Sequence, residues 1–161
     1  MHKAVFLDRD GTINVDYGYV YKPEDLTLLP GVVEALRSLQ SQGYLLIVIT
    51  NQSGVGRGYF TLEDANRFNK LMQQALEEQG VTITDFFTCP HSPEEICDCR
   101  KPSPLMVNEA IRKYDIDPSQ SYMIGDKKSD VACGTNANLT SYLVTPEHSL
   151  LYWSNQITGN Q

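Results

Sequence analysis

The sequence predicts an α/β fold, a three-layer Rossmann-like parallel sheet with helices on both faces. Short apolar runs that read as strands alternate with segments whose apolar residues recur at helical spacing. Residues 44–50 are almost entirely apolar, which indicates a strand covered on both faces. Polar residues follow several of these runs directly, at the strand ends where open α/β sheets bind their ligands.

The strand predictions rest on apolar runs that end at polar or turn residues. Residues 4–7 form the first run, which ends at Asp8, and residues 44–50 form the second. Shorter runs predict three more strands, at residues 85–88, 121–125 and 141–144.

The helix predictions rest on amphipathic spacing and on end signals. A first helix is expected to follow Pro30-Gly31 and to end at Gly43. A second is expected between Thr61, a suitable N-cap, and Gly80. A third is expected to begin at Ser103-Pro104, because proline is well tolerated in the first turn.

No internal repeat or linker divides the 161 residues, so we expect one domain, 1–161. Residues 14–30 and 51–59 lack a regular pattern, and the excursions within them at 16–21 and 54–59 are too short for a separate cap domain. We expect them to form irregular excursions and short flap loops at the sheet edge. The residues after Thr145 give no clear prediction.

Composition limits the possible partners. The net charge of −7 argues against a nucleic-acid or anionic-membrane surface, although local cations could still bind a small anion. No apolar run approaches the ~20 residues that a membrane span needs, and the first run is too short for a signal peptide. We therefore expect a cytoplasmic protein with no nucleic-acid or membrane partner, and we expect a monomer.

Two carboxylates, Asp8 and Asp10, follow the first predicted strand in the stretch VFLDRDGT. An isolated D-x-D-G stretch is as often a plain acidic turn. Here, however, Asp126 follows another predicted strand, and carboxylates that meet at one sheet edge require a cation, most naturally Mg2+. A carboxylate can attack phosphorus when a metal ion and a lysine reduce the charge repulsion.

These residues fit the roles that phosphoryl transfer needs. Asp8 would attack the phosphorus and form an aspartyl-phosphate. Asp10 would protonate the leaving alkoxide and later deprotonate the attacking water. Thr50, at the end of the second predicted strand, would hydrogen-bond the transferring group, and Lys101 would place a cation on its far side.

Three of the four cysteines and one of the three histidines lie within residues 89–99, in a C-x-H-x5-C-x-C arrangement. Four nitrogen and sulfur ligands in one loop are typical of a structural, tetrahedral Zn2+ site. A reducing cytoplasm disfavours a disulfide, and zinc would fix the backbone directly before Arg100 and Lys101. The predicted zinc ligands are Cys89, His91, Cys97 and Cys99.

The stretches DRDGT, VITNQSG, CRKP and GDKKSD resemble, in order, the four motifs of the haloacid dehalogenase superfamily of phosphatases. The stretches FLDRDGTINVDYGYV and TNQSGVGRGYFT, together with the cysteine loop, resemble its heptose bisphosphate phosphatases more narrowly. The likeness implies Mg2+ bound by Asp8, the Asp10 backbone carbonyl and Asp126, with Asp130 just outside. It also implies substrate contacts from Asp16, Tyr17, Gly18, Tyr19, Thr50, Asn51, Gln52, Ser53, Arg100, Lys101 and Lys127.

The substrate implied by this resemblance is a small phosphorylated sugar, a heptose 1,7-bisphosphate that loses its 7-phosphate in the synthesis of bacterial surface polysaccharide. The five residues between His91 and Cys97 are closer to the related histidinol-phosphate phosphatases, which form the alternative. An alternative from another class is a non-catalytic, zinc-stabilised binding module. Such a module would be expected to have lost some of Asp8, Asp10, Lys101 and Asp126, yet all four are present.

Overall fold

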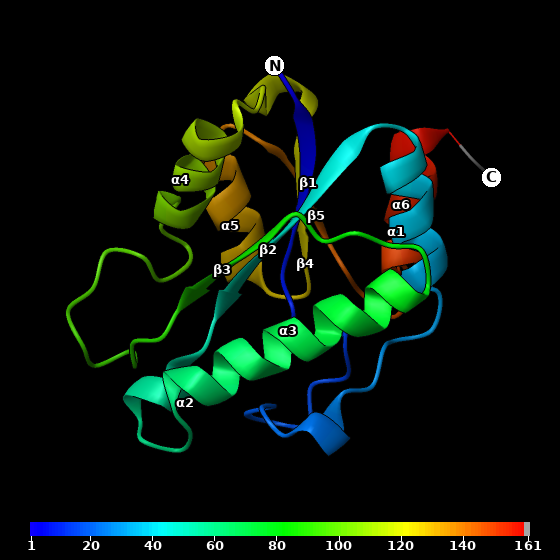
Figure 1. Cartoon of the computed structure of the whole chain (residues 1–161). Coiled ribbons are helices and arrows are strands. Elements are labelled where there is room, and N and C mark those ends of the chain that lie inside the picture. Colours follow the sequence, from blue (N-terminus) through cyan, green and yellow to red (C-terminus); the bar gives the residue numbers. More distant parts are fainter. Residues whose placement is uncertain (160–161) are drawn as a thin grey trace.

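The computed structural model describes residues 1–159, and within them five parallel strands form one sheet (Figure 1). The strand order is β3-β2-β1-β4-β5, so the first strand of the chain lies at the centre. The predicted α/β class is confirmed. The strands are β1 (Lys3–Leu7), β2 (Tyr44–Asn51), β3 (Asp85–Cys89), β4 (Tyr122–Gly125) and β5 (Thr140–Leu143).

Helices cover both faces of the sheet, as predicted. One apolar core lies between the sheet and α1, α3 and α6, and a second lies between the sheet and α4 and α5. The helices are α1 (Val32–Ser41), α2 (Ser53–Gly56), α3 (Leu62–Glu78), α4 (Leu105–Tyr114), α5 (Lys128–Asn136) and α6 (Leu150–Thr158), with short 3-10 turns η1 (Pro23–Asp25) and η2 (Pro118–Gln120).

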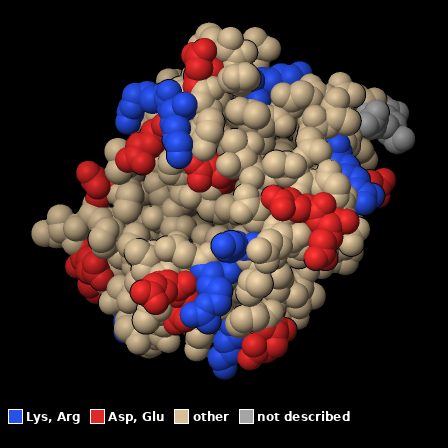
Figure 2. Space-filling model, viewed as in Figure 1, with Lys and Arg blue, Asp and Glu red and all other residues tan. Residues whose placement is uncertain are grey.

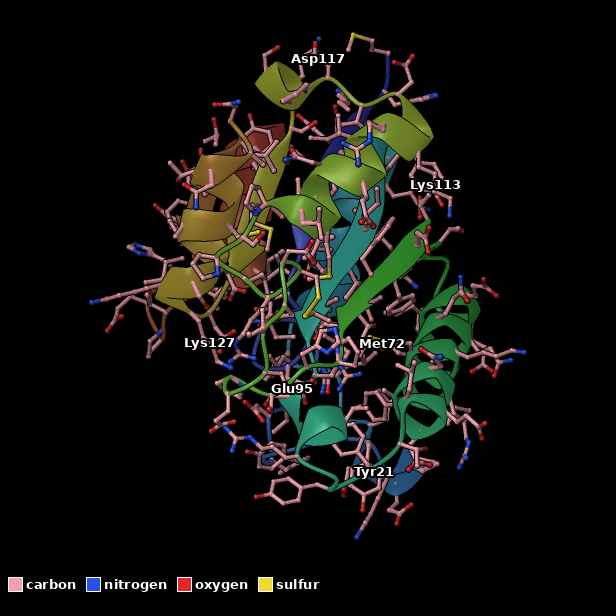
Figure 3. All side chains as sticks on the ribbon, turned by 90° about the vertical axis from the view of Figure 1, so that its left-hand side faces the viewer. Tyr21, Met72, Glu95, Lys113, Asp117 and Lys127 are labelled. Carbon is pink, nitrogen blue, oxygen red and sulfur yellow. A yellow bond between two sulfur atoms is a disulfide. The ribbon has the colours of Figure 1, made fainter. Side chains whose placement is uncertain are left out.

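Strand register brings the functional residues together. In β1, Leu7 pairs with Val48 of β2 and with Ile124 of β4. Residues just beyond these positions therefore leave the sheet at one edge, as parallel pairing requires. Figure 3 shows Tyr21, Glu95 and Lys127 at this end of the molecule, opposite Asp117.

The segment 51–59 differs from the predicted irregular flap, because it contains the one-turn helix α2. Val55 N donates to Gln52 O at 3.2 Å and Arg57 N donates to Ser53 O at 3.0 Å. Gly54 lies against the Phe60 ring so closely that an added Cβ would be 2.2 Å from it. The sequence hides this turn because its glycines are also typical of loops.

The C-terminal segment, for which no clear prediction was possible, forms α6 against α1 and the edge strand β5. The Trp153 ring stacks on Tyr142 with centroids 4.3 Å apart, and its Nε1 donates to Leu143 O. Ser154 Oγ donates to Ala35 O of α1 at 3.0 Å. Over the described residues, no helix has both the length and the apolar character needed to cross a membrane.

Candidate active site

A buried lysine, Lys101, lies between a carboxylate that follows β1 and a carboxylate in the first turn of α5. Lys101 Nζ lies 2.8 Å from Asp8 Oδ1 and 2.6 Å from Asp130 Oδ1, and it donates to Ile49 O at 2.8 Å. Burial opposes the charge on Lys101, but the two carboxylates outweigh burial and raise its pKa. Lys101 therefore stays charged at neutral pH and partly neutralises an otherwise acidic site.

Burial alone would raise the pKa of Asp8, but the Lys101 charge and hydrogen bonds from Asp126 and Lys101 lower it. Asp8 is only 5% exposed and is nevertheless held in the ionised form. An ionised, desolvated carboxylate at the end of a central strand is suited to nucleophilic attack.

Asp126 shares the site, since one carboxylate oxygen each from Asp8, Asp126 and Asp130 lies within 4.8 Å of the others. Burial, the hydrogen bond with Asp8 and the charges of Asp8 and Asp130 raise the pKa of Asp126 to about 7. Gly11 permits the close approach, because an added Cβ would lie 2.2 Å from Asp126 Oδ2. Three clustered carboxylate oxygens are the donor set that a hard divalent cation prefers.

The pKa of Asp126 predicts a pH-dependent affinity for Mg2+. Below pH 7 protons compete with the metal ion for this carboxylate, so acidification should weaken binding and alkalinisation should strengthen it. We expect Kd to rise about tenfold from pH 8 to pH 6, because a carboxylate with a pKa of about 7 is mostly ionised at pH 8 and mostly protonated at pH 6. Isothermal titration calorimetry with MgCl2 measures this Kd. Asp117→Asn is the control, because Asp117 is a half-buried carboxylate at the other end of the molecule. Equal Kd values at both pH values would contradict the prediction.

Asp10 is held by donors from three residues. Within residues 1–159, its carboxylate accepts from the Arg9 guanidinium, from Asn14 Nδ2 at 3.0 Å and from Gln52 Nε2 at 3.2 Å. Gln52 Nε2 also donates to Thr50 Oγ1 at 2.8 Å. Because the Thr50 oxygen accepts this bond, its O–H is available to donate to a bound group.

All of these groups except Asp126 and the residues that support Asp10 from behind lie around one cavity of about 260 Å3, which Asp126 does not line. Most residues predicted to contact substrate line it. In the described part of the chain, Tyr17 and Arg100 are the predicted contacts that do not, while Ser129 and Asp130 were not predicted as contacts and do. The lining residues are Asp8, Asp10, Asp16, Gly18, Tyr19, Thr50, Asn51, Gln52, Ser53, Lys101, Lys127, Ser129 and Asp130.

Asn51 also fixes the chain that carries Lys101. Its Oδ1 accepts from Lys101 N at 3.1 Å, and its Nδ2 lies 3.5 Å from Lys101 O. Asp130 has a similar second contact, because its Oδ2 accepts from Lys127 N at 3.0 Å at the start of α5. The sequence suggested a supporting position for Asp130, and the structure adds its direct ion pair with Lys101.

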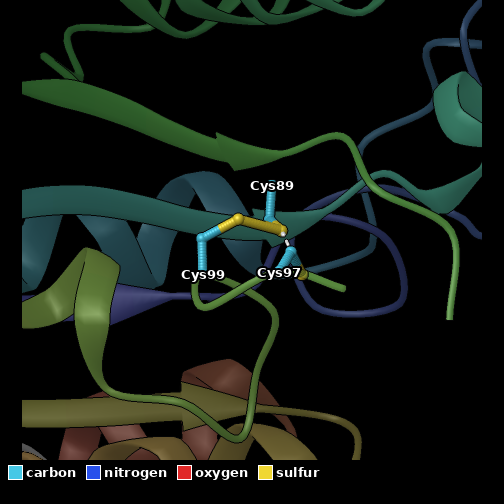
Figure 4. A group of neighbouring side chains, drawn as sticks. All are labelled: Cys89, Cys97 and Cys99. Carbon is cyan, nitrogen blue, oxygen red and sulfur yellow. Dashed lines mark hydrogen bonds between the residues drawn. A yellow bond between two sulfur atoms is a disulfide. The ribbon is translucent and has the colours of Figure 1, made fainter. Parts of the chain in front are cut away.

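The cysteine loop brings three of the four predicted zinc ligands together (Figure 4). Cys89 and Cys99 are joined by a disulfide, which differs from the reduced thiols expected from sequence. Cys97 Sγ lies 3.9 Å from Cys89 Sγ. His91 is apart from the sulfurs, with Nδ1 3.0 Å from Glu95 Oε2. The other Glu95 oxygen accepts from Ser92 N in the same turn, so Glu95 is held where it can bind the His91 imidazole in place of a metal ion.

The comparisons agree with this fold and site. A family model described as HAD-hydrolase-like matches residues 98–149. A structure of D,D-heptose 1,7-bisphosphate phosphatase from B. bronchiseptica, complexed with magnesium and phosphate, aligns with a TM-score of 0.90 and 30% identity over 99% of both chains. A putative HAD-like phosphatase from Mesorhizobium loti aligns with a TM-score of 0.87 and 31% identity, over 99% of this chain and 87% of that one. The fold and the site thus define a hydrolase of the haloacid dehalogenase class.

Two curated relatives narrow the class. The D-glycero-beta-D-manno-heptose-1,7-bisphosphate 7-phosphatase of Haemophilus influenzae is 45% identical over 86% of this chain and 79% of its own. The protein of the same name from Helicobacter pylori is 44% identical over 92% of this chain and 87% of its own. The chain belongs to the family of D-glycero-D-manno-heptose-1,7-bisphosphate 7-phosphatases.

Proposed function

We propose that this protein removes the 7-phosphate of D-glycero-D-manno-heptose 1,7-bisphosphate with Mg2+ and an aspartyl-phosphate intermediate, in the synthesis of nucleotide-activated heptose for lipopolysaccharide. The observation that carries the proposal is the placement of Asp8, which faces Lys101 at 2.8 Å and shares a carboxylate cluster with Asp126 beside the cavity. The relatives at 43–46% identity support the substrate, since they carry the heptose name.

The first half of the reaction transfers the phosphoryl group to the protein. An oxygen of Asp8 forms a bond to phosphorus while the bond from phosphorus to the C7 oxygen of the sugar breaks. Asp10, in its acid form, gives its proton to the departing alkoxide. Lys101 and the Thr50 hydroxyl stabilise the negative charge on the phosphoryl oxygens.

The second half returns the protein to its starting state. Asp10, now ionised, takes a proton from a water molecule that attacks the phosphorus, and the bond to Asp8 breaks to release inorganic phosphate. Asp8, the Asp10 backbone carbonyl and Asp126 would hold Mg2+. When bound, this ion offsets the repulsion between the carboxylate and the phosphate. The magnesium complex of the B. bronchiseptica structure supports this choice of metal.

Phosphate release tests the proposal directly. We expect fastest turnover with the β anomer of the heptose bisphosphate, because the relatives carry that name, and loss of activity after removal of Mg2+. Phosphorus NMR of the product should show that the 1-phosphate remains. A preference for histidinol phosphate would establish the alternative phosphatase. No Mg2+-dependent turnover of any phosphate ester would favour the binding module.

For the cysteine loop we propose a structural zinc site in the reduced protein, in which the Cys89–Cys99 disulfide is open and the thiolates of Cys89, Cys97 and Cys99 bind the ion, with His91 as the fourth ligand after a change of rotamer. Two thiolates on tetrahedral zinc lie about 3.8 Å apart if each Zn–S bond is about 2.3 Å. The separation of 3.9 Å between Cys89 Sγ and Cys97 Sγ supports this donor set. Zinc would fix the loop immediately before Lys101 and carry out no chemistry.

The zinc proposal and the disulfide make opposite predictions for purified protein. With zinc bound, denatured protein should show four free thiols and one zinc ion per chain, measured by Ellman's reagent and mass spectrometry. With the disulfide intact, it should show two thiols and no zinc. Cys99→Ser should lose zinc and lower kcat through a displaced Lys101, whereas Cys133→Ser, outside the loop, should retain zinc. Full activity after chelation of zinc would contradict the link to Lys101.

The proposal also includes the predictions made from the sequence about binding partners, location and oligomeric state. Acidic and basic side chains are interspersed on the face shown in Figure 2, without one extended basic area. This pattern and the net charge of −7 support the expectation that nucleic acid is not a partner. A cytoplasmic location, a monomeric state, a single domain over residues 1–161 and the absence of a membrane partner stay predictions.

A further inference from the structure

Arg9 lies between the two catalytic carboxylates in sequence and is completely buried. Its side chain passes under α3, where the guanidinium carbon lies 4.5 Å from the centre of the Phe68 ring. A charged group in such a place is costly unless its donors are paired. The partners of Arg9 therefore indicate why the fold retains it.

The Arg9 guanidinium forms a bidentate pair of hydrogen bonds with the Asp10 carboxylate. Arg9 Nε donates to Asp10 Oδ1 at 2.8 Å, and Nη2 reaches Asp10 Oδ2 at 3.1 Å. Two parallel bonds fix the plane of a carboxylate as well as its distance, which one ammonium group cannot do. The Asp10 side chain keeps 17% of its surface exposed, and Asp10 lines the cavity.

The other end of the guanidinium is anchored to α3. Arg9 Nη1 donates to Asn69 Oδ1 at 2.9 Å, and Nη2 donates to Val20 O at 2.8 Å. Asn69 is itself 5% exposed, and its Nδ2 contacts Thr88 Oγ1 of β3 at 3.3 Å. A line of buried and half-buried polar contacts thus runs from β3 through α3 to Asp10.

We propose that Arg9, anchored by Asn69, is a positioning residue that holds the Asp10 carboxylate in the orientation needed for proton transfer to the leaving group. This inference rests on the proposed phosphatase function. In this role Arg9 does not contact the substrate. It also takes no part in the ion pair of the nucleophile Asp8, whose partner is Lys101. Arg9 acts only through Asp10, so its effect must depend on how much the leaving group needs a proton.

The test compares two leaving groups. Release of an alkoxide from a sugar phosphate needs a proton, whereas p-nitrophenolate leaves without one. We expect Arg9→Lys to lower kcat for the heptose bisphosphate about 10²-fold, the lower range for general acid catalysis, with KM changed less than about twofold. The burst of p-nitrophenolate from p-nitrophenyl phosphate, which reports the first half-reaction alone, should slow less than about fivefold. Asp10→Asn is the reference and should show the same selectivity.

Asn69→Ala provides the second variant, because it removes the anchor and leaves the Asp10–Arg9 fork in place. It should lower the alkyl phosphate rate about fivefold and have no further effect in the Arg9→Lys background, since the two residues act in series. This variant decides the question if Arg9→Lys does not fold in thermal denaturation. Equal losses on both substrates, or additive effects of the two substitutions, would overturn the inference. Failure of the parent protein to hydrolyse sugar phosphates would instead overturn the proposed function.

Discussion

Replacing Asp8 with Asn should abolish the hydrolysis of sugar phosphates, with a loss of about 10⁴-fold or more. The amide has nearly the shape of the carboxylate but carries no negative charge to attack phosphorus. Removal of a nucleophile from other hydrolases costs about 10⁶-fold, which makes this expectation conservative. The variant should fold, because Lys101 keeps its second partner, Asp130, at 2.6 Å.

Two measurements check the role of Asp8. Phosphate release gives the rate, and acid quenching during turnover should trap phosphoprotein in the parent but not in Asp8→Asn. Asp64→Asn is a suitable control, because Asp64 does not line the cavity and forms the capping box at the start of α3 with Thr61. Retention of a tenth of the parent activity by Asp8→Asn would exclude Asp8 as the nucleophile.

Replacing Lys101 with Met should damage both activity and stability. The change removes the cation beside Asp8, so we expect kcat to fall about 10³-fold, a magnitude typical of a lost transition-state contact. It also leaves Asp8 and Asp130 buried without their cation, which typically costs about 3–5 kcal/mol of unfolding free energy. Urea denaturation measures this loss, and Mg2+ should restore part of it by replacing the missing charge.

The stability loss should depend on pH in a defined direction. Without Lys101, the pKa values of the buried carboxylates rise, so their charge is disfavoured in the folded state. The loss should therefore be largest near pH 8 and should shrink towards pH 5, as the carboxylates take up protons. Lys113→Met is the matched control, because Lys113 pairs with Asp85 at 2.9 Å while 60% of its side chain is exposed. It should cost at most about 1 kcal/mol at either pH. Equal losses for both variants would contradict the special role of Lys101.

The sequence was sufficient for those parts of the molecule that local chemistry determines. The five strands appear as short apolar runs, and Thr61, a suitable N-cap, marks the start of α3. Parallel pairing then places Asp8, Thr50 and Asp126 at one edge, so their meeting needed only the fold class. The sequence also predicted a cation from Lys101 at this site, and the structure adds its direct ion pair with Asp8.

The parts that the sequence did not predict depend on contacts between distant segments. An arginine in a turn would ordinarily be expected at the surface. Arg9 is buried because α3 places Asn69 and Phe68 against it. Helix α6 has a mixed sequence, and its position depends on Ala35 of α1, whose carbonyl accepts from Ser154 Oγ across 119 residues of sequence. The sequence could identify His91 as a residue that binds metal ions. Its contact with Glu95 depends on the conformation of the loop, which the sequence does not show.

The central place of the first strand has a consequence for biosynthesis. Ala4 N donates to Ser121 Oγ, a partner 117 residues later in the chain, and β1 pairs with β4 in the same region. At about 5–20 residues per second, a ribosome needs roughly 6–23 s to add that stretch. During this interval one side of β1 has no strand to pair with, and an unpaired apolar strand edge is prone to aggregation. Nascent chains halted before β4 should therefore be strong chaperone clients, and those halted after it should be weak ones.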